Sequence, residues 1–266
     1  MGEVDDNLKK IMQKLHLDNE FQSAAIFRKM LGFKPDDPRV IIWDAITDSP
    51  DNLGPADQFD YFLLTGSAHM VDSGLPWIKT TEDFLKKLID AEVPGLATCF
   101  GFQLLCHAYG AQVGRKPETP YKPEFGTATL NYSELAFEIP LLDGVFDRSL
   151  NVFNSSNHEQ VILTPPLYAG AKILFADEYW PNKGMVFPLG NLSPAEAFRQ
   201  GKVVLGLQDH IEKSPFGLEL ARQAEASYYR DFDIPIDKMV FRDNPEVRKI
   251  FLNILKQLAP ASSIWT

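Results

Sequence analysis

The sequence predicts an α/β protein with a doubly wound, mostly parallel sheet flanked by helices. Two compact apolar runs, residues 39–45 and 60–65, end in polar or turn residues, as strands buried on both faces of a parallel sheet do. Residues 81–91 place their apolar side chains at helical spacing. Residues 95–98 form a short apolar run that leads into a second helical pattern over 99–110. Alternation of this kind is typical of βαβ units.

The two helices have recognisable ends. For the helix over 81–91, Thr80 or Thr81 is the expected N-cap, because acidic residues follow in the first turn. Gly110 is expected to end the helix over 99–110, since glycine readily adopts the left-handed conformation that closes a helix.

The second half of the chain is less regular. Expected strands cover residues 127–132, 137–139, 150–153, 171–175 and 203–207. Expected helices cover residues 193–199, 216–230 and 244–258. Residues 182–192 are rich in Gly, Pro and Asn, so they are expected to form an inserted loop.

The N-terminal region allows two interpretations. Residues 1–10 are acidic and are expected to form a solvated extension. Residues 4–32 fit two helices, but residues 14–17 also fit a first strand, followed by a helix over 21–31. We favour the strand, because a sheet of this kind needs a central strand ahead of Val40.

Composition and charge limit the function classes. The chain has 266 residues, 45% of them hydrophobic and 23% charged, which excludes a disordered, collagen-like or coiled-coil protein and suits one domain over residues 1–266. The net charge of −10 without a basic cluster argues against nucleic acid or an anionic membrane surface as partner. Two cysteines and no apolar leader or membrane-length run predict a cytoplasmic protein.

The sharpest local feature is Cys99, at the predicted junction between a strand and a helix. Ala97 and Gly101 flank it at two residues on either side, and small neighbours allow the sharp turn that lifts a nucleophile clear of a sheet. The helix N-terminus would favour the thiolate there. The alternative is a buried core cysteine, which is a common fate of cytosolic cysteines.

A cysteine nucleophile needs a base, and the base needs an orienting group. His210 follows the strand expected over 203–207, and Glu212 lies two residues further on. The alternative for His210 is an exposed loop histidine. Cys106 and His107 are expected to be structural, and no Cys-x-x-Cys or His-x-x-x-His pair suggests a zinc site.

Together these residues resemble the class I glutamine amidotransferase family, the glutaminase part of enzymes such as GMP synthase. The family's elbow G-x-C-x-G-x-Q corresponds to residues 97–103, and its Q-x-H-P-E motif corresponds to residues 208–212. Residues 65–67 match its [S/T]-G-[G/S] loop, and residues 158–166 match a segment with His at its head and Pro at its end. The resemblance implies a flavodoxin-like core with a small antiparallel β extension.

The resemblance also implies roles for individual residues. Cys99 would attack the side-chain amide of glutamine, His210 would move the protons, and Glu212 would orient His210. The oxyanion hole would use the backbone N–H groups of Ser67 and Phe100. The residues that would hold the substrate are Gly66, Gln103, Glu159 and Gln160.

Five positions depart from the family pattern. Ala97 stands in place of Gly and Phe102 in place of His, and neither removes a catalytic side chain. Ile211 replaces Pro, which leaves the backbone between the histidine and the glutamate less constrained. Ser67 and Ala68 stand where Gly-Pro is common, so the oxyanion loop is expected to be set differently.

Three functions follow from this resemblance. The first is a glutaminase without cofactor that passes ammonia to a synthetase partner, because the chain holds neither a synthetase domain nor a G-x-x-x-x-G-K-[S/T] loop. The second is a free-standing hydrolase of γ-glutamyl peptides or amides. The third is an inactive binding or regulatory module that kept the fold.

Overall fold

The structure is a computed structural model that describes residues 23–67, 69–114, 126–144, 151–154, 160–177, 180–212, 249–250 and 252–254. The helices, with short 3₁₀ turns marked η, are α2 Ser23–Met30, η1 Pro50–Leu53, η2 Ala56–Gln58, α3 Pro76–Asp90, α4 Phe100–Ala108, α5 Glu134–Glu138, η3 Pro140–Leu142 and α6 Pro194–Arg199. The strands are β1 Phe62–Leu64, β2 Gly95–Thr98, β3 Val113–Gly114, β4 Gly126–Thr129, β5 Asn131–Tyr132, β6 Asn151–Asn154, β7 Val161–Ile162, β8 Lys172–Ala176, β9 Gly184–Pro188 and β10 Val203–Leu207.

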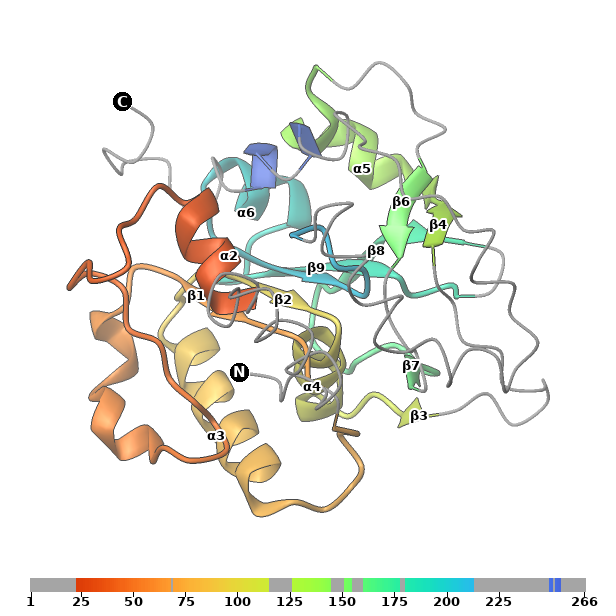
Figure 1. Ribbon diagram of the computed structural model, residues 1–266. Coiled ribbons are helices and arrows are strands. Elements are labelled where there is room, and N and C mark those ends of the chain that lie inside the picture. The colour runs from red at the N-terminus through yellow and green to blue at the C-terminus, as the bar shows by residue number, and fades with distance from the viewer. Residues whose placement is uncertain are drawn as a thin grey trace.

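A mixed sheet forms the centre of the molecule, in the order β1-β2-β10-β9-β8-β5 (Figure 1). Strands β1, β2 and β10 run parallel to one another. Strands β9, β8 and β5 continue the sheet in antiparallel pairs, and β3 with β7 and β4 with β6 form two small antiparallel sheets. The predicted α/β architecture with an antiparallel extension is confirmed.

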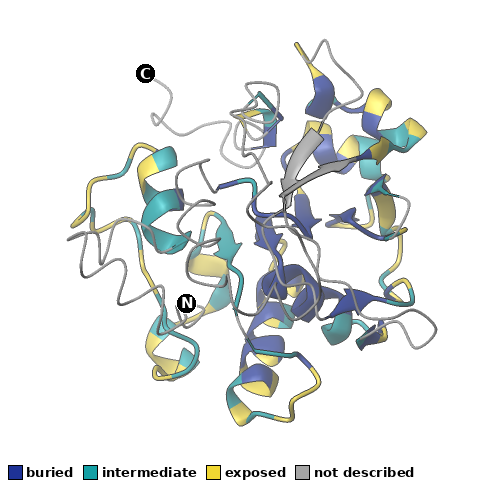
Figure 2. Cartoon of the chain, turned by 45° about the vertical axis from the view of Figure 1, so that its right-hand side comes forward, coloured by how far each residue is buried: buried dark blue, intermediate teal, exposed yellow. Residues whose placement is uncertain are grey.

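Helices cover both faces of this sheet, and alternate residues of the central strands face opposite layers, as the period of two in a strand requires. On β10, Val203 and Leu205 pack in a core cluster with Phe27 of α2 and Phe198 of α6. Val204, between them, packs in a second cluster formed largely by α3 and α4. In Figure 1, α2 and α6 accordingly lie on one side of the sheet and α3 and α4 on the other. Figure 2 shows these central strands buried.

Helix α3 begins earlier than predicted. Its first residue is Pro76, which is favoured at a helix start because its fixed φ suits the first turn and no N–H is needed there. Thr80 and Thr81 are therefore interior residues and not N-caps. Their hydroxyls donate to the carbonyl groups one turn back, of Pro76 at 3.1 Å and Trp77 at 2.7 Å.

The predicted strand over residues 39–45 is wrong. Ile41 is 60% exposed and Ile42 is 41% exposed, so this apolar run lies outside the core. Asp44 and Asp48 close local turns: the Asp48 carboxylate accepts from Asp44 N at 3.0 Å, and the Asp44 carboxylate accepts from Ile46 N at 3.1 Å. Such short side chains compete with a sheet for backbone donors.

The predicted loop over residues 182–192 is also wrong. Strand β9 occupies Gly184–Pro188, and all five of its residues are buried between β8 and β10. Gly184 is required for close packing, since a methyl group there would lie 2.1 Å from the Phe175 ring. The flanking Gly, Pro and Asn residues that suggested a loop mark the ends of a buried strand.

The predicted strand over residues 137–139 is wrong as well. Helix α5 covers Glu134–Glu138, and Pro140 then starts the 3₁₀ turn η3. Ala136 is fully buried under this helix. Pro140 cannot donate to a sheet ladder, and Phe137 is 45% exposed, so the β preference of Phe137 and Ile139 does not produce a strand here.

The remaining predicted elements fall into two groups. Strands β1, β2, β6, β8 and β10 and helices α2, α4 and α6 lie where patterns predicted them, and Gly110 follows α4 with φ +80°. The single strand expected over 127–132 is instead divided into β4 and β5, which belong to different sheets. Only residues 249–250 and 252–254 of the expected helix over 244–258 are described, and they are helical. The N-terminal extension, the alternative first strand over 14–17 and the helix over 216–230 lie outside the described residues. None of the helices in the described ranges is long and apolar enough to span a bilayer.

Candidate active site

Cys99 stands at the sharp turn between β2 and α4. Its φ of 52° and ψ of −116° lie outside the regions that side chains favour, and strain of this kind is concentrated at functional sites. Cys99 N donates to the carbonyl of Leu207 at 2.8 Å, which ties the turn to the end of β10. Gly101 is tightly packed, since a methyl group there would lie 2.4 Å from the carbonyl oxygen of Leu64. The small residue expected at this position is therefore required.

His210 and Glu212 lie in the turn that follows β10. His210 Nδ1 is 2.7 Å from Glu212 Oε1, and the glutamate side chain is completely buried. This contact directs the opposite edge of the imidazole away from the glutamate, as an orienting carboxylate does. Ile211, which replaces the family's proline, is partly buried against the core. In this chain, packing of Ile211 against the core constrains the turn, as the ring of proline would do in the family pattern.

Gly66, just after β1, brings these two elements together. A methyl group at Gly66 would lie 2.8 Å from His210 Cε1, 3.4 Å from His210 Nε2 and 3.3 Å from Cys99 Cβ. The imidazole edge and the cysteine side chain therefore border the same small volume. Only a residue without a side chain fits between them, which explains the glycine.

Gln103 and Gln160 belong to a buried amide network beside the elbow. The Gln103 side-chain amide donates to the carbonyl of Gln160 at 2.8 Å and to the side-chain oxygen of Gln208 at 3.3 Å. Gln160 accepts from Val71 N at 2.9 Å and donates to the Asp72 carboxylate. These bonds fasten α4 and the loop after β1 to one another. Glu159 and His158 lie outside the described residues.

The loop after β1 approaches the elbow from the side of α3. The Ser67 hydroxyl accepts from His69 N at 3.2 Å and lies 3.1 Å from His69 Nδ1. The His69 ring packs edge-on against Trp77, and Trp77 packs against Phe100, the residue after Cys99. Both expected oxyanion donors, Ser67 and Phe100, thus belong to one packed unit. Ala68 lies outside the described residues.

A buried ionic cluster next to His210 was not predicted. Lys183 Nζ lies 2.6 Å from Asp177 and 3.5 Å from Asp209, and the lysine side chain has no exposed surface. Gln208 N donates to the carbonyl of Lys183 at 2.8 Å. The cluster therefore fixes the start of the turn that carries His210. The sequence feature that could have predicted this cluster is the lysine directly before the apolar run of residues 184–188.

The two cysteines differ in access to solvent. Cys99 is 8% exposed, whereas Cys106 has no exposed surface. Burial raises the pKa of the Cys106 thiol well above its ordinary value. Cys106 is thus the core residue that was expected. His107 is also structural, with its Nδ1 2.5 Å from Glu82 of α3.

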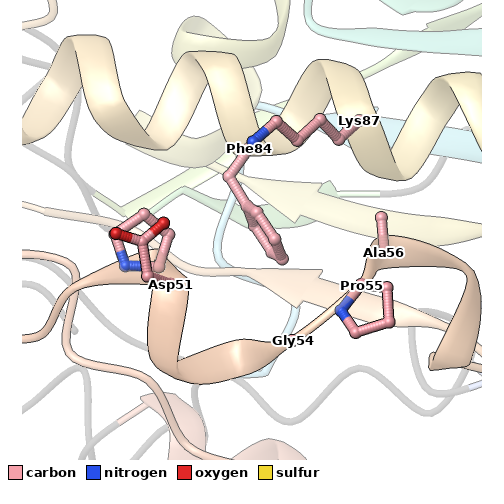
Figure 3. Close-up of a pocket in the computed structure, with 7 residues that line it drawn as sticks. Asp51, Gly54, Pro55, Ala56, Phe84 and Lys87 are labelled. Atoms are coloured by element: carbon pink, nitrogen blue, oxygen red, sulfur yellow. The ribbon is translucent and has the colours of Figure 1, made fainter.

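A separate cavity of about 280 Å³ lies between α3 and the 3₁₀ turns before β1 (Figure 3). Phe84 extends from α3 toward the turn at Gly54 and Pro55, and Lys87 and Asp51 lie at its edges. Its lining includes none of the expected site residues. Within the described ranges, no three His, Cys, Asp or Glu side chains are grouped so as to hold a metal ion.

Comparison with known proteins gives the following relatives. The chain is 30% identical over 144 residues to a glutamine-hydrolyzing GMP synthase subunit of Sulfolobus acidocaldarius, covering 54% of this chain and 69% of that protein. It is 34% identical over 64 residues to gamma-glutamyl peptidase 4 of Arabidopsis thaliana, a match over 24% of this chain and only 26% of the peptidase. No protein-family model matches the chain.

Solved structures share the fold. A glutamine amidotransferase of Thermotoga maritima superposes with a TM-score of 0.59 at 19% identity, covering 78% of this chain and 81% of that one. A glutamine amidotransferase of Methylobacillus flagellatus gives a TM-score of 0.56 at 20% identity, covering 77% and 79%. At these identities the likeness concerns the arrangement of the backbone.

Proposed function

This chain belongs to the class I glutamine amidotransferase family, and from that membership we propose that it is a cysteine hydrolase that cleaves the γ-amide of glutamine through a γ-glutamyl thioester. One observation supports this most strongly: the strained Cys99 turn and the His210 imidazole border the same volume beside Gly66. The ammonia would pass to an acceptor bound by a synthetase partner.

In this proposal the reaction proceeds in two stages, formation of the thioester and then its hydrolysis. His210 takes the proton of the Cys99 thiol, the sulfur bonds to the γ-carbonyl carbon, the carbon–nitrogen bond breaks, and His210 delivers that proton to the departing ammonia. Water then attacks the thioester while His210 takes its proton, the carbon–sulfur bond breaks, His210 returns the proton to the Cys99 sulfur, and glutamate leaves. Glu212 accepts the hydrogen bond from Nδ1 throughout, so that it stabilises the imidazolium.

The oxyanion of each tetrahedral intermediate needs donors on the side opposite His210. The backbone N–H of Phe100 at the start of α4 and that of Ser67 after β1 are the groups we assign to this role. Removing one such donor typically costs about 3 kcal/mol of transition-state stabilisation. The packing of His69, Trp77 and Phe100 supports the assignment, because it holds the two donor segments in fixed relation.

The test uses a diazoketone analogue of glutamine and mass spectrometry. A live site forms one covalent adduct on Cys99, glutamine protects it, and Cys99→Ser abolishes the adduct while Cys106→Ser keeps it. Glutamine turnover should be lost in the first variant only. A folded wild-type protein that forms no adduct and releases no ammonia would instead be the inactive binding module.

The second candidate is a free-standing hydrolase of γ-glutamyl peptides or amides. The local similarity to the Arabidopsis gamma-glutamyl peptidase favours it. Both functions use the same residues and differ only in the leaving group. Steady-state kinetics with glutamine and with a γ-glutamyl dipeptide, without any partner, separate them: a higher kcat/KM for the dipeptide identifies the peptidase.

A further inference from the structure

The buried carboxylate of Glu212 has a contact that the family motifs do not include. The Ser23 hydroxyl donates to Glu212 Oε1 at 3.2 Å, and the same oxygen lies 2.7 Å from His210 Nδ1. The two residues are 189 positions apart in the chain. We propose that Ser23 is a positioning residue that keeps Glu212 ionised and aimed at His210. The proposal rests on the proposed function, in which His210 serves Cys99.

Core packing holds Ser23 at this place. Ser23, Phe27 and Leu31 are each four residues apart, so they lie along one face of the helical segment. Phe27 is 1% exposed and Leu31 is 3% exposed, and both belong to the core cluster that includes Leu207 at the end of β10. The helix is therefore anchored over the strand that leads to His210, and Ser23 on this face reaches Glu212.

Chemistry explains why a hydroxyl is useful there. A carboxylate removed from water is costly unless hydrogen-bond donors replace the lost solvent, and the Glu212 side chain has no exposed surface. The Ser23 hydroxyl supplies one such donor, since it lies 3.2 Å from Glu212 Oε1. The basic residues Arg28 and Lys29 are in the last turn and so lie toward the opposite end of the helix.

The other charged groups near this site come from three elements. Asp209 precedes His210 in the turn after β10, Lys183 precedes β9, and Asp177 follows β8. Lys183 contacts both aspartates, so its positive charge partly neutralises the two negative charges of the cluster. Among the described residues, His210 also contacts Glu212, and Cys99 lies across Gly66 from the imidazole. Substitution of Ser23 leaves all of these in place, and a change in pH dependence therefore reports on Glu212 and the groups it supports.

The experiment compares Ser23→Ala, Ser23→Thr and the control Ser193→Ala. Ser193 caps α6 through its contact with Glu196, so its loss lowers thermal stability and leaves the candidate site intact. Two quantities are followed against pH: kcat/KM for glutamine or a γ-glutamyl dipeptide, and the rate at which iodoacetamide alkylates Cys99. The second needs no substrate, which separates this proposal from the proposed function.

Removing the donor disfavours the carboxylate form of Glu212. Ser23→Ala should therefore lower kcat/KM by about 10- to 150-fold, the size expected for the loss of a hydrogen bond to a charged group. The acidic limbs of both profiles should move to higher pH. Ser23→Thr keeps a hydroxyl and should restore most of both effects, and Ser193→Ala should change neither profile.

Two outcomes would overturn the proposal. In the first, Ser23→Ala changes only the melting temperature, as Ser193→Ala does, and both pH profiles stay where they are. In the second, Ser23→Thr fails to restore a profile that Ser23→Ala has moved, which would make the effect one of packing. If the wild-type protein turns over neither substrate, the proposed function fails, and the alkylation profile alone decides for or against Ser23.

Discussion

The environment of each cysteine determines what its sulfur can do. Cys99 occupies a strained turn that the chain can form because Gly101 and Gly66 leave room on either side. Cys106, on the same helix, is enclosed by apolar side chains and has no exposed surface. Identical thiols one short helix apart therefore have different chemistry.

Alkylation should distinguish the two thiols. Burial raises the pKa of the Cys106 thiol well above its ordinary value, and this thiol has no exposed surface, so it should resist alkylation in the folded protein. Iodoacetamide near neutral pH should add one label per native molecule, at Cys99. Intact-mass measurement of Cys99→Ser should show no label, and Cys106→Ser should match the wild type. Two labels on the native protein would contradict this.

Gly66 is a position where function should suffer more than stability. Gly66→Ala would put a methyl group 2.8 Å from His210 Cε1, so the imidazole must move away from Cys99. We expect kcat/KM to fall about 100-fold, because small misplacement of reacting groups has effects of that order. Gly114→Ala is the matched control, since within the part of the chain that the structure describes its methyl group meets only Leu163, at 3.8 Å. Equal activity of the two variants would remove Gly66 from the site.

At the scale of elements, close contacts between backbones position the elbow. Helix α4 approaches β1 so closely that Gly101 faces the carbonyl of Leu64 with no intervening side chain. On the other side, β10 approaches α4 where Gly206 faces the Phe102 ring. The helix is thus fitted between two strands, and its N-terminus has little freedom to shift.

This packing reverses an ordinary substitution effect. Glycine to alanine within a helix normally stabilises a protein by about 0.5–1 kcal/mol. Gly101→Ala should instead destabilise by about 2 to 3 kcal/mol, because the methyl group would lie 2.4 Å from the Leu64 carbonyl oxygen and backbone must move. Urea denaturation measures the difference. A gain in stability would show that α4 and β1 are further apart.

The Lys183 cluster joins β8, β9 and the turn after β10. Lys183→Met should cost about 3 to 5 kcal/mol of unfolding free energy, since it leaves two buried carboxylates without their cation. Lys202→Met is the control, because Lys202 pairs with Glu92 at the same 2.6 Å distance but at the surface. An exposed pair is worth about 0–1 kcal/mol. Similar losses in both variants would argue against the buried cluster.

Across the whole molecule, the sequence predicted most accurately those elements that depend on patterns of neighbouring residues. The strand, turn and helix around Cys99 depend on neighbouring small residues, and the pattern therefore contained the necessary information. The error at Ile41 and Ile42 has a different source, because apolarity alone does not tell whether a run joins a sheet. Strand β9 was missed since Gly and Pro at its ends mimic a loop.

The candidate site was predicted only where residue types carry the chemistry. Cys99, His210 and Glu212 have recognisable spacing, and the structure brings their segments together around Gly66. Ser23 meets Glu212 from 189 positions away, and Lys183 meets Asp177 and Asp209 from across neighbouring strands, so no local pattern marks these contacts. Their contributions become visible only when the sheet order and the helix layers are known.

The sheet order also bears on how the protein comes into being. Strand β10 is the last described strand along the chain, yet it lies between β2 and β9. During synthesis from the N-terminus, β1 and β2 leave the ribosome well before the strand that joins them to the other half. The nascent chain therefore carries two unpaired strand edges, which invite association with other chains. In that chain Cys99 also lacks its neighbour His210, so the proposed site forms only once β10 joins the sheet.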